Sequence, residues 1–355
     1  MLKTCKRVIA SLLVVMVLLS FFSLGKVHNT VFAKNKEDII VDDIIDNVLE
    51  FYKSESTELS TWDEIVSLHW SGEDINADPW QLPDWGSDDL NDESPASSYA
   101  GYILGLIARG EDPTNIWDRN LVEELQEMQN ERGAFGNIND HIWAVIALEA
   151  SDGKYDVNKA MEYLTSQQKD DGGYAYGEDD TPELISEPDM TGMALVALSM
   201  HMDKDNVAET VDRALEYLEA SQLSTGGFES WGMENTNSIA AVISGLIALE
   251  EDVLSEKWTK DGNTMVDALS EFLLDDGSFT YGLEPKESNK MATYQALIAL
   301  NDLKKSKSVW KNINAKATVG EQSAKENDNK TVIFAVIGVA LLGGFIYYIR
   351  RKKQV

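Results

Sequence analysis

Cysteine is nearly absent from this sequence, since Cys5 is the only one among 355 residues. It lies in an N-terminal segment that we expect to be removed, which leaves the mature chain without a thiol. Such a chain has no disulfide, no cysteine-ligated zinc, no thioester and no cysteine nucleophile. For an exported protein, this indicates that packing alone stabilises the fold.

Positive charge is scarce between the two ends of the chain. Residues 1–33 and 331–355 contain eight of the 30 basic residues and none of the 61 acidic ones, so the region between them has 61 acidic against 22 basic residues, a net charge of −39. This charge disfavours binding to nucleic acid and to anionic membrane surfaces. Such a charge is typical of a soluble domain outside the cell. The acidic residues either attract cations or only form a hydrated surface.

Residues 1–33 have the features of a secretory signal. Lys3, Lys6 and Arg7 precede an apolar run, and residues 31–33 (Val-Phe-Ala) provide a site for cleavage after the alanine. The run is slightly long for a signal, so an uncleaved N-terminal anchor is the alternative.

Residues 331–349 form a second membrane signal. These nineteen residues carry no charge, and they are long enough to cross a hydrocarbon core of about 30 Å as a helix. The basic tail 350–355 is expected to stay in the cytoplasm, which places the preceding domain outside the cell membrane. The arrangement resembles the tail of Gram-positive wall-anchored proteins, but no Leu-Pro-x-Thr-Gly motif precedes the span. We therefore expect a single-pass membrane tether without covalent wall attachment.

One short unit recurs four times along the chain. Each copy has a leucine, a second position four residues later, a glycine four residues after that, and an aromatic residue two further on. The second position is Gln129, Gln168 and Gln222 in three copies and Leu273 in the last. The copies are LQEMQNERGAF (125–135), LTSQQKDDGGY (164–174), LEASQLSTGGF (218–228) and LSEFLLDDGSF (269–279).

Each copy separates two different kinds of helix. The segment upstream has apolar residues on one face, whereas the segment downstream is apolar on nearly all sides and is expected to be buried. A ring of buried inner helices inside a ring of amphipathic outer helices satisfies this pattern; an open superhelix would leave apolar edges bare. The fold class is therefore an all-α, α/α toroid over residues 34–303, followed by a polar stalk at 304–330. The inner segments are 98–108, 141–150, 190–200, 238–249 and 291–300.

The first part of the toroid is less regular. Residues 39–52 are expected to form an outer helix and residues 61–70 a short second helix. Residues 71–96 contain Trp80, Trp85, Pro83, Pro95 and many acidic residues, and they are expected to form a loop.

The Gln-x-x-x-Gly-Gly-aromatic unit resembles the repeat of the terpene cyclase and protein prenyltransferase superfamily. Residues 110–117, 134–151, 187–198 and 288–300 are most similar to bacterial surface proteins with a prenyltransferase-like toroid. Those proteins are related in fold to the helical domain of intrinsic factor and transcobalamin. The resemblance covers residues 38–303 and implies the α/α toroid, a fold that serves many chemistries.

This sequence lacks the residues that carry out the chemistry of these families. The Asp-x-Asp-Asp acid motif of the cyclases is not completed by any Asp-Asp pair, and the zinc site of the prenyltransferases needs a cysteine. His69, His141 and His201 are scattered without ligand spacing. No Ser-His-Asp group, phosphate loop or nucleotide motif is present. We therefore assign no catalytic residue, metal or cofactor.

A ligand pocket is expected at one mouth of the toroid. The N-termini of the inner helices surround this mouth, where their free N–H groups and positive dipole ends face any ligand. Several of these residues have a second interpretation, since the acidic and amide side chains also cap helices and the aromatic ones also fill cores. The candidate binding residues are Asp140, His141, Trp143, Tyr176, Asp189, Thr191, Trp231, Asn235, Asn237, Tyr281, Asn289 and Tyr294.

Three functions remain open. The first is a surface protein that binds a small molecule without catalysis; resemblance to the cobalamin carriers implies a corrinoid or another bulky ligand, although those carriers use a second, β-rich domain to hold it. The second is an enzyme acting on an isoprenoid or polysaccharide. The third is a protein-interaction module on the cell surface that uses the stretch from Trp62 to Trp85.

Overall fold

The structure is a computed structural model that describes residues 36–177 and 184–314. The predicted signal, most of the predicted stalk and the apolar segment 331–349 lie outside these residues. Contacts divide the chain into a unit Met1–Ile39, described only at residues 36–39, and a unit that begins at Ile40. Within the described ranges, no helix combines the length and apolarity needed to cross a bilayer.

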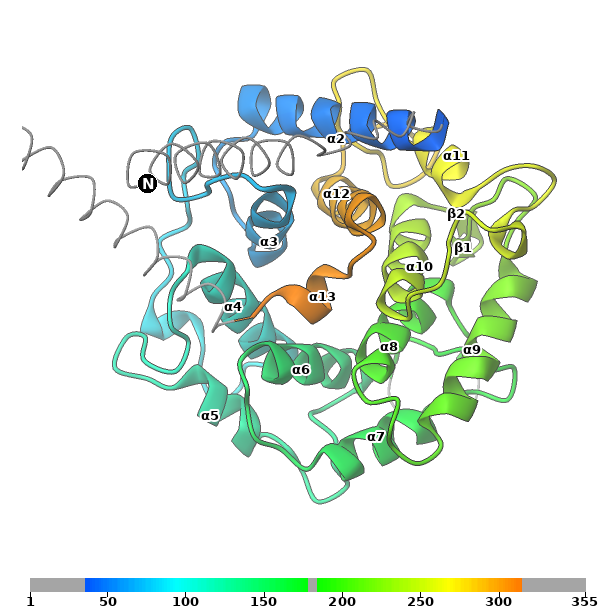
Figure 1. Ribbon diagram of the computed structural model, residues 1–355. Coiled ribbons are helices and arrows are strands. Elements are labelled where there is room, and N and C mark those ends of the chain that lie inside the picture. Colours follow the sequence, from blue (N-terminus) through cyan, green and yellow to red (C-terminus); the bar gives the residue numbers. More distant parts are fainter. Residues whose placement is uncertain (1–35, 178–183, 315–355) are drawn as a thin grey trace, which may run out of the picture. The chain divides into compact units, whose positions relative to one another are not determined.

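The unit from Ile40 onward contains two concentric rings of helices (Figure 1). Each inner helix contacts the next, and the last inner helix contacts the first, so the inner ring is closed. This confirms the predicted α/α toroid. The inner ring consists of α3 (Trp62–Ser71), α4 (Ala96–Arg109), α6 (Ile138–Ala150), α8 (Pro188–Ser199), α10 (Thr236–Ala248) and α12 (Lys290–Lys305). The outer ring consists of α2 (Lys36–Glu55), α5 (Leu121–Glu127), α7 (Val157–Ser166), α9 (Val207–Ser221) and α11 (Met265–Ser270).

Short elements connect the helices. Strands β1 (Glu229–Ser230) and β2 (Met233–Glu234) pair antiparallel just before α10. Two 3-10 turns, η1 (Ser87–Asp89) and η2 (Glu256–Trp258), lie in connecting loops, and α13 (Val309–Asn312) follows α12.

Burial explains which helices form which ring. All thirteen residues of α10 are buried, as expected for a helix that is apolar on every side. The outer helix α7 instead buries one face. Gly192 of α8 and Gly245 of α10 let their helices approach closely, because a Cβ atom on either would overlap with backbone of the other helix.

The repeated glutamine holds neighbouring repeats together. The Nε2 atom of Gln168 donates to the carbonyl of Gly172 at 2.9 Å and to the carbonyl of Thr210, in the next outer helix, at 2.7 Å. Gln129 and Gln222 make equivalent pairs of hydrogen bonds in their own repeats. The most recognisable residue of the repeat therefore has a structural role.

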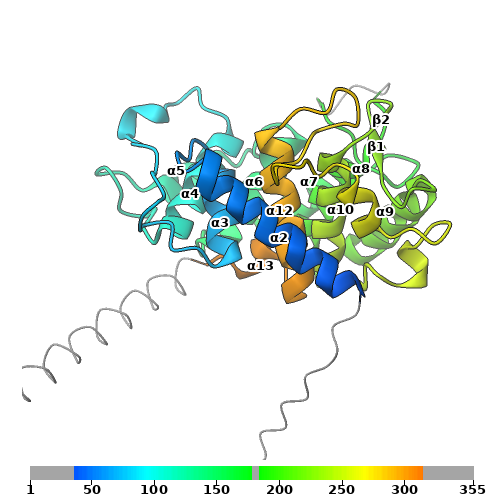
Figure 2. The same cartoon turned by 90° about the horizontal axis from the view of Figure 1, so that it is seen from above.

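The segment after α12 belongs to the toroid. Helix α12 runs to Lys305, past the predicted domain boundary at 303, and the short helix α13 lies inside the ring. Figure 2 shows α13 at the end of the ring opposite the β1–β2 hairpin. Lys311 of α13 donates to the carbonyls of Ser199 at 3.5 Å and Ala248 at 2.9 Å, at the C-terminal ends of α8 and α10. Residues 304–314 thus close one end of the ring instead of forming a stalk.

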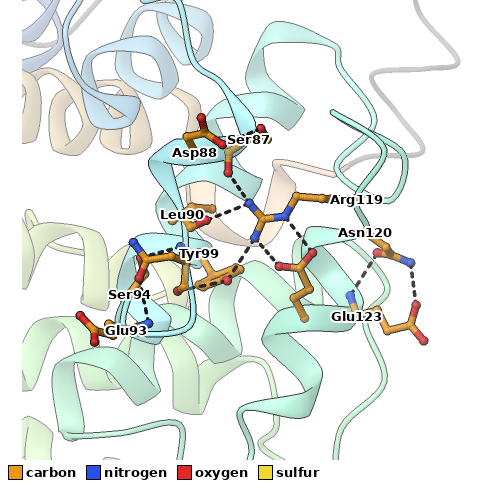
Figure 3. Close-up of polar contacts among 11 residues, drawn as sticks. Ser87, Asp88, Leu90, Glu93, Ser94, Tyr99, Arg119, Asn120 and Glu123 are labelled. Atoms are coloured by element: carbon orange, nitrogen blue, oxygen red, sulfur yellow. Dashed lines mark hydrogen bonds and ion pairs between the residues drawn. The ribbon is translucent and has the colours of Figure 1, made fainter.

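The long loop before α4 is fixed by one arginine (Figure 3). Arg119 donates to the carbonyls of Ser87 at 2.6 Å and Leu90 at 2.9 Å, to the hydroxyl of Tyr99 at 3.2 Å, and to both carboxylate oxygens of Glu124. A planar guanidinium with five donors suits this arrangement. The predicted loop is therefore ordered by side-chain contacts and contains only the short 3-10 turn η1 among its described residues.

Candidate functional site

A central cavity of about 400 Å³ lies within the inner ring. Five of the inner helices, α3, α6, α8, α10 and α12, line it together with α13, and Tyr176 contributes from the loop before α8. Its volume falls in the range of small-molecule sites. None of the described residues that line it is a lysine or an arginine.

The inner helices bring their N-terminal ends to the same end of the ring. The hydroxyl of Ser97, at the start of α4, donates to Asp140, at the start of α6, at 2.5 Å. The amino group of Lys290, at the start of α12, donates to Ser60, just before α3, at 3.3 Å. Contacts between matching ends show that these neighbouring helices run parallel.

Three tryptophans form one wall of the central cavity. Trp310 of α13 packs edge-to-face against Trp143 of α6 and Trp62 of α3, with ring centroids 5.1 and 6.2 Å apart, and the latter two rings lie 5.0 Å from each other. Edge-to-face packing is a favourable arrangement of aromatic rings. The short helix α13 therefore gives the cavity an aromatic floor.

Asp63 provides an acidic group beside this wall. It lies in the first turn of α3 and accepts a hydrogen bond from the hydroxyl of Tyr294 on α12. Burial raises the pKa of Asp63 to about 7, and the neighbouring charge of Glu64 adds to the shift. Near neutral pH the carboxyl group is therefore protonated in part of the molecules, so it can donate as well as accept.

A second acidic group comes from the start of α8. The Oδ1 atom of Asp189 accepts from the backbone N–H of Met190 at 2.9 Å and from the hydroxyl of Ser230 at 3.2 Å. Burial raises the pKa of Asp189. Burial and the charge of Asp189 also raise the pKa of Glu187, just before α8, to about 7.

Asn237 has a polar atom without a protein partner. This residue lines the cavity and is 9 % exposed, and its Oδ1 atom finds no hydrogen-bond donor among the described residues. A buried amide oxygen left unpaired costs about 1–3 kcal/mol. Such an atom is expected to bond to a ligand or to ordered water.

Five of the predicted binding residues line the central cavity: Trp143, Tyr176, Asp189, Asn237 and Tyr294. Trp231 lies outside it, in the β1–β2 turn, with 76 % of its surface exposed.

The other predicted binding residues serve the fold. Asn235 and Asn289 cap α10 and α12. Thr191 donates to the carbonyl of Glu187 at 2.8 Å and accepts from the N–H of Tyr174. Tyr281 is half-buried, and its carbonyl accepts from the N–H of Thr236 at 3.0 Å.

Asp140 and His141 are also turned away from the cavity lining. Asp140 was expected to cap its helix, but Asn137 caps α6 and Asp140 bonds to Ser97 instead. Asp189 likewise does not cap α8, whose N-cap is Glu187. His141 is fully buried.

Sequence reasoning missed Trp62, Asp63 and Trp310. Residues 61–70 were interpreted as a short helix without a place in the ring, and Trp310 fell within the predicted stalk. The apolar residues of α3 and the isolated tryptophan at 310 were the available signals. Among residues 36–177 and 184–314, no three His, Cys, Asp or Glu side chains are grouped so that they could hold a metal ion.

The closed ring with a lined centre defines the protein as an α/α toroid. The chain belongs to the prenyltransferase alpha-alpha toroid family, whose model matches residues 47–229 and 186–326. No curated protein matches the chain. A solved structure of an unsaturated glucuronyl hydrolase variant with dGlcA-Glc-Rha-Glc is similar, with 10 % identity and a TM-score of 0.49 over 76 % of this chain and 98 % of that one. At these values, the likeness carries no information on chemistry.

Proposed function

We propose that this chain binds one small molecule in the central cavity and acts as a binding protein outside the cell, tethered by the predicted span 331–349. The observation that carries the proposal is the cavity itself, which has aromatic and acidic walls and is lined by Asn237, a residue whose Oδ1 atom is unpaired among the described residues. Apolar walls with a few polar groups are typical of ligand sites.

The charges of the cavity restrict the ligand. Asp63 and Asp189 contribute carboxyl groups, and no basic side chain among the described residues lines the space. An anionic ligand, including an isoprenoid diphosphate, would meet unfavourable charge. The ligand is therefore neutral or cationic. A corrinoid is too bulky to be enclosed in about 400 Å³ and would have to lie across the mouth.

Asn237→Leu tests the cavity as the binding site. Neutral sugars, organic amines, cobinamide and cobalamin are titrated into the full chain in detergent, with tryptophan fluorescence and calorimetry as readouts. The ligand that binds should lose about tenfold in affinity in the variant, the effect of one hydrogen bond of about 1.4 kcal/mol. Stability should be unchanged or higher, because the variant removes an unpaired buried atom.

Ala241→Phe provides a second variant, since Ala241 lines the cavity and a phenyl ring there would occupy it. Ala208→Phe, on the exposed face of α9, is the matched control and should bind normally. Wild-type affinity in both cavity variants would place the ligand elsewhere and contradict the proposal.

A second candidate function is acid catalysis on a neutral substrate, such as an isoprenoid or polysaccharide. Asp63 favours it, because a carboxyl group with a pKa of about 7 can deliver a proton near neutral pH. If turnover is found, Asp63→Asn should reduce kcat by about 10²-fold or more. Asp140→Asn, outside the cavity, is the control. Equal loss in both variants, or none in Asp63→Asn, argues against this role.

The tryptophan-rich stretch does not form an exposed interface. Trp80 is 7 % exposed, Trp62 lines the cavity, and Trp85 packs on Tyr102 with ring centroids 4.7 Å apart and lies under Arg109. These indoles stabilise the toroid, so an interaction module built on them is not proposed.

A further inference from the structure

A second pocket of about 650 Å³ lies beside the central cavity. Its walls come from the segment before α8, from α9 and from the β1–β2 turn, with Glu187, Tyr217, Ser230 and Trp231 among them. Tyr176 lines both the second pocket and the central cavity. The two spaces therefore meet at the side chain of Tyr176.

The wall between the two spaces is thin. Asp189, which lines the central cavity, accepts a hydrogen bond from Ser230, which lines the second pocket, at 3.2 Å. Glu187 lies two residues before Asp189 and lines the second pocket. A ligand longer than the central cavity would have to pass Tyr176 to reach the second pocket.

Trp231 is the most unusual residue along this path. Its indole is 76 % exposed, and its backbone has a φ of 58°, a left-handed conformation that tryptophan rarely adopts. An exposed ring held in an unfavourable conformation at a pocket is a functional candidate.

The surroundings of Trp231 are unusual as well. Seven large apolar side chains are exposed among the described residues, and all but Met202 lie before α8 or α10, before α12, or in the first turn of α12. The apolar exposure is thus concentrated at the mouth of the toroid.

We propose that the ligand is a neutral oligosaccharide whose end sugar occupies the central cavity and whose chain passes Tyr176 to lie on the indole of Trp231. The proposal rests on the proposed function of the cavity. One face of a sugar ring presents C–H groups that pack on an indole, and its hydroxyl groups both donate and accept. Tyr217 lines the second pocket and carries a hydroxyl group of the same kind.

The charge of the two spaces favours a neutral oligosaccharide over an acidic glycan or a basic peptide. No lysine or arginine among the described residues lines either space, which disfavours acidic glycans. Burial raises the pKa of Glu187 to about 7, so this carboxyl carries a proton in part of the molecules near neutral pH. A protonated carboxyl attracts a basic peptide weakly but donates well to a sugar hydroxyl.

The test uses chain length. Glucose, its β-1,4 and α-1,4 oligomers and the β-1,4 oligomers of N-acetylglucosamine, each from one to four units, are titrated into the full chain in detergent. We expect at least one series to bind, with a rise of at least tenfold in affinity from monomer to trimer. Trp231→Gly should abolish this rise and leave monomer affinity unchanged, because the monomer occupies only the central cavity.

Trp231→Gly is suitable because glycine tolerates the left-handed backbone, so the variant should fold as well as the parent. Trp231→Phe should keep part of the rise, and Met202→Ala, exposed elsewhere, should keep all of it. A rise with length that survives Trp231→Gly, or its absence in every series, would overturn the extended site.

The outcomes also separate this inference from the proposed function. If an amine or a corrinoid binds in a way that depends on Asn237 and no sugar binds, the proposal of a sugar ligand is overturned. The cavity then remains a binding site. If oligolysine binds in a way that depends on Trp231 and sugars do not bind, the proposal that the ligand is neutral is overturned. If no ligand depends on Asn237 or Ala241, both proposals fail together.

Discussion

At the scale of single residues, burial has opposite effects on acids and bases. His141 is fully buried between Phe135 and Tyr163, with ring centroids 5.8 and 4.7 Å away, and burial lowers its pKa to about 3. Asp63 and Glu187 have raised pKa values for the same reason. In each case the neutral form is favoured, because a charge loses its hydration when buried.

His141→Phe should weaken the dependence of stability on acid pH. Below pH of about 6.5 the unfolded chain binds a proton at this histidine, whereas the folded chain does not until the pH approaches 3. Folding is therefore disfavoured as the pH falls through this window, by up to about 1.4 kcal/mol per pH unit. Above it the contribution of His141 is fully retained.

Urea unfolding of both chains at pH 7 and pH 5 measures this effect. The wild-type chain should lose about 2 kcal/mol more than the variant between the two pH values. Comparing the two chains cancels the opposite contribution of the raised carboxyl pKa values. Identical losses in both chains would show that His141 does not remain neutral in the fold.

At the scale of elements, the turn after each outer helix joins it to the next repeat. The first glycine of the turn has a positive φ, and a Cβ atom there would overlap with the next outer helix or the residue that precedes it. This holds for Gly133 against Lys159, Gly172 against Arg213, Gly226 against Thr264 and Gly277 against Asn47. Glycine is therefore needed for two reasons, conformation and close approach.

Gly172→Ala and Gly72→Ala separate these two reasons. Gly72 ends α3 with a φ of 96°, close to the 92° of Gly172, but a Cβ atom on Gly72 meets nothing within 4 Å. Alanine at Gly72 should cost about 1–2 kcal/mol for the left-handed backbone, and alanine at Gly172 a further 1–3 kcal/mol for the overlap. The free energy of unfolding of each variant measures its cost in stability. Equal costs would mean that the close approach at Gly172 does not add to the cost.

At the scale of the whole toroid, the ring is completed by contacts between the last repeat and the first helices of the chain. The last copy of the repeat has Leu273 in place of glutamine, yet its Gly277 still packs against the backbone of Asn47 in α2. Inside the ring, α12 contacts α3. Helix α13 then lies at one end, so a ligand of the proposed site would enter from the other end, where the N-termini of the inner helices lie.

The repeated helix pairs could be predicted because their signals are local. Apolar spacing, the glycine stop and the buried character of segments such as 238–249 are properties of neighbouring residues, and the observed helices follow them within a few residues. Capping was less predictable. Asp140 and Asn137 both suit the start of α6, and contact with Ser97 of another helix decides between them.

The sequence by itself determined that this chain folds as a ring of paired helices, because residues that face water or avoid it recur with a helical period and a fixed turn. Only the tertiary structure decided which side chains share the cavity. Trp62, Asp63, Asn237 and Trp310 are brought together by packing between helices that are far apart along the chain. The spacing of residues along the chain does not predict which distant helices pack together. Neither the aromatic floor of the cavity nor the unpaired amide oxygen of Asn237 could therefore be predicted from the sequence.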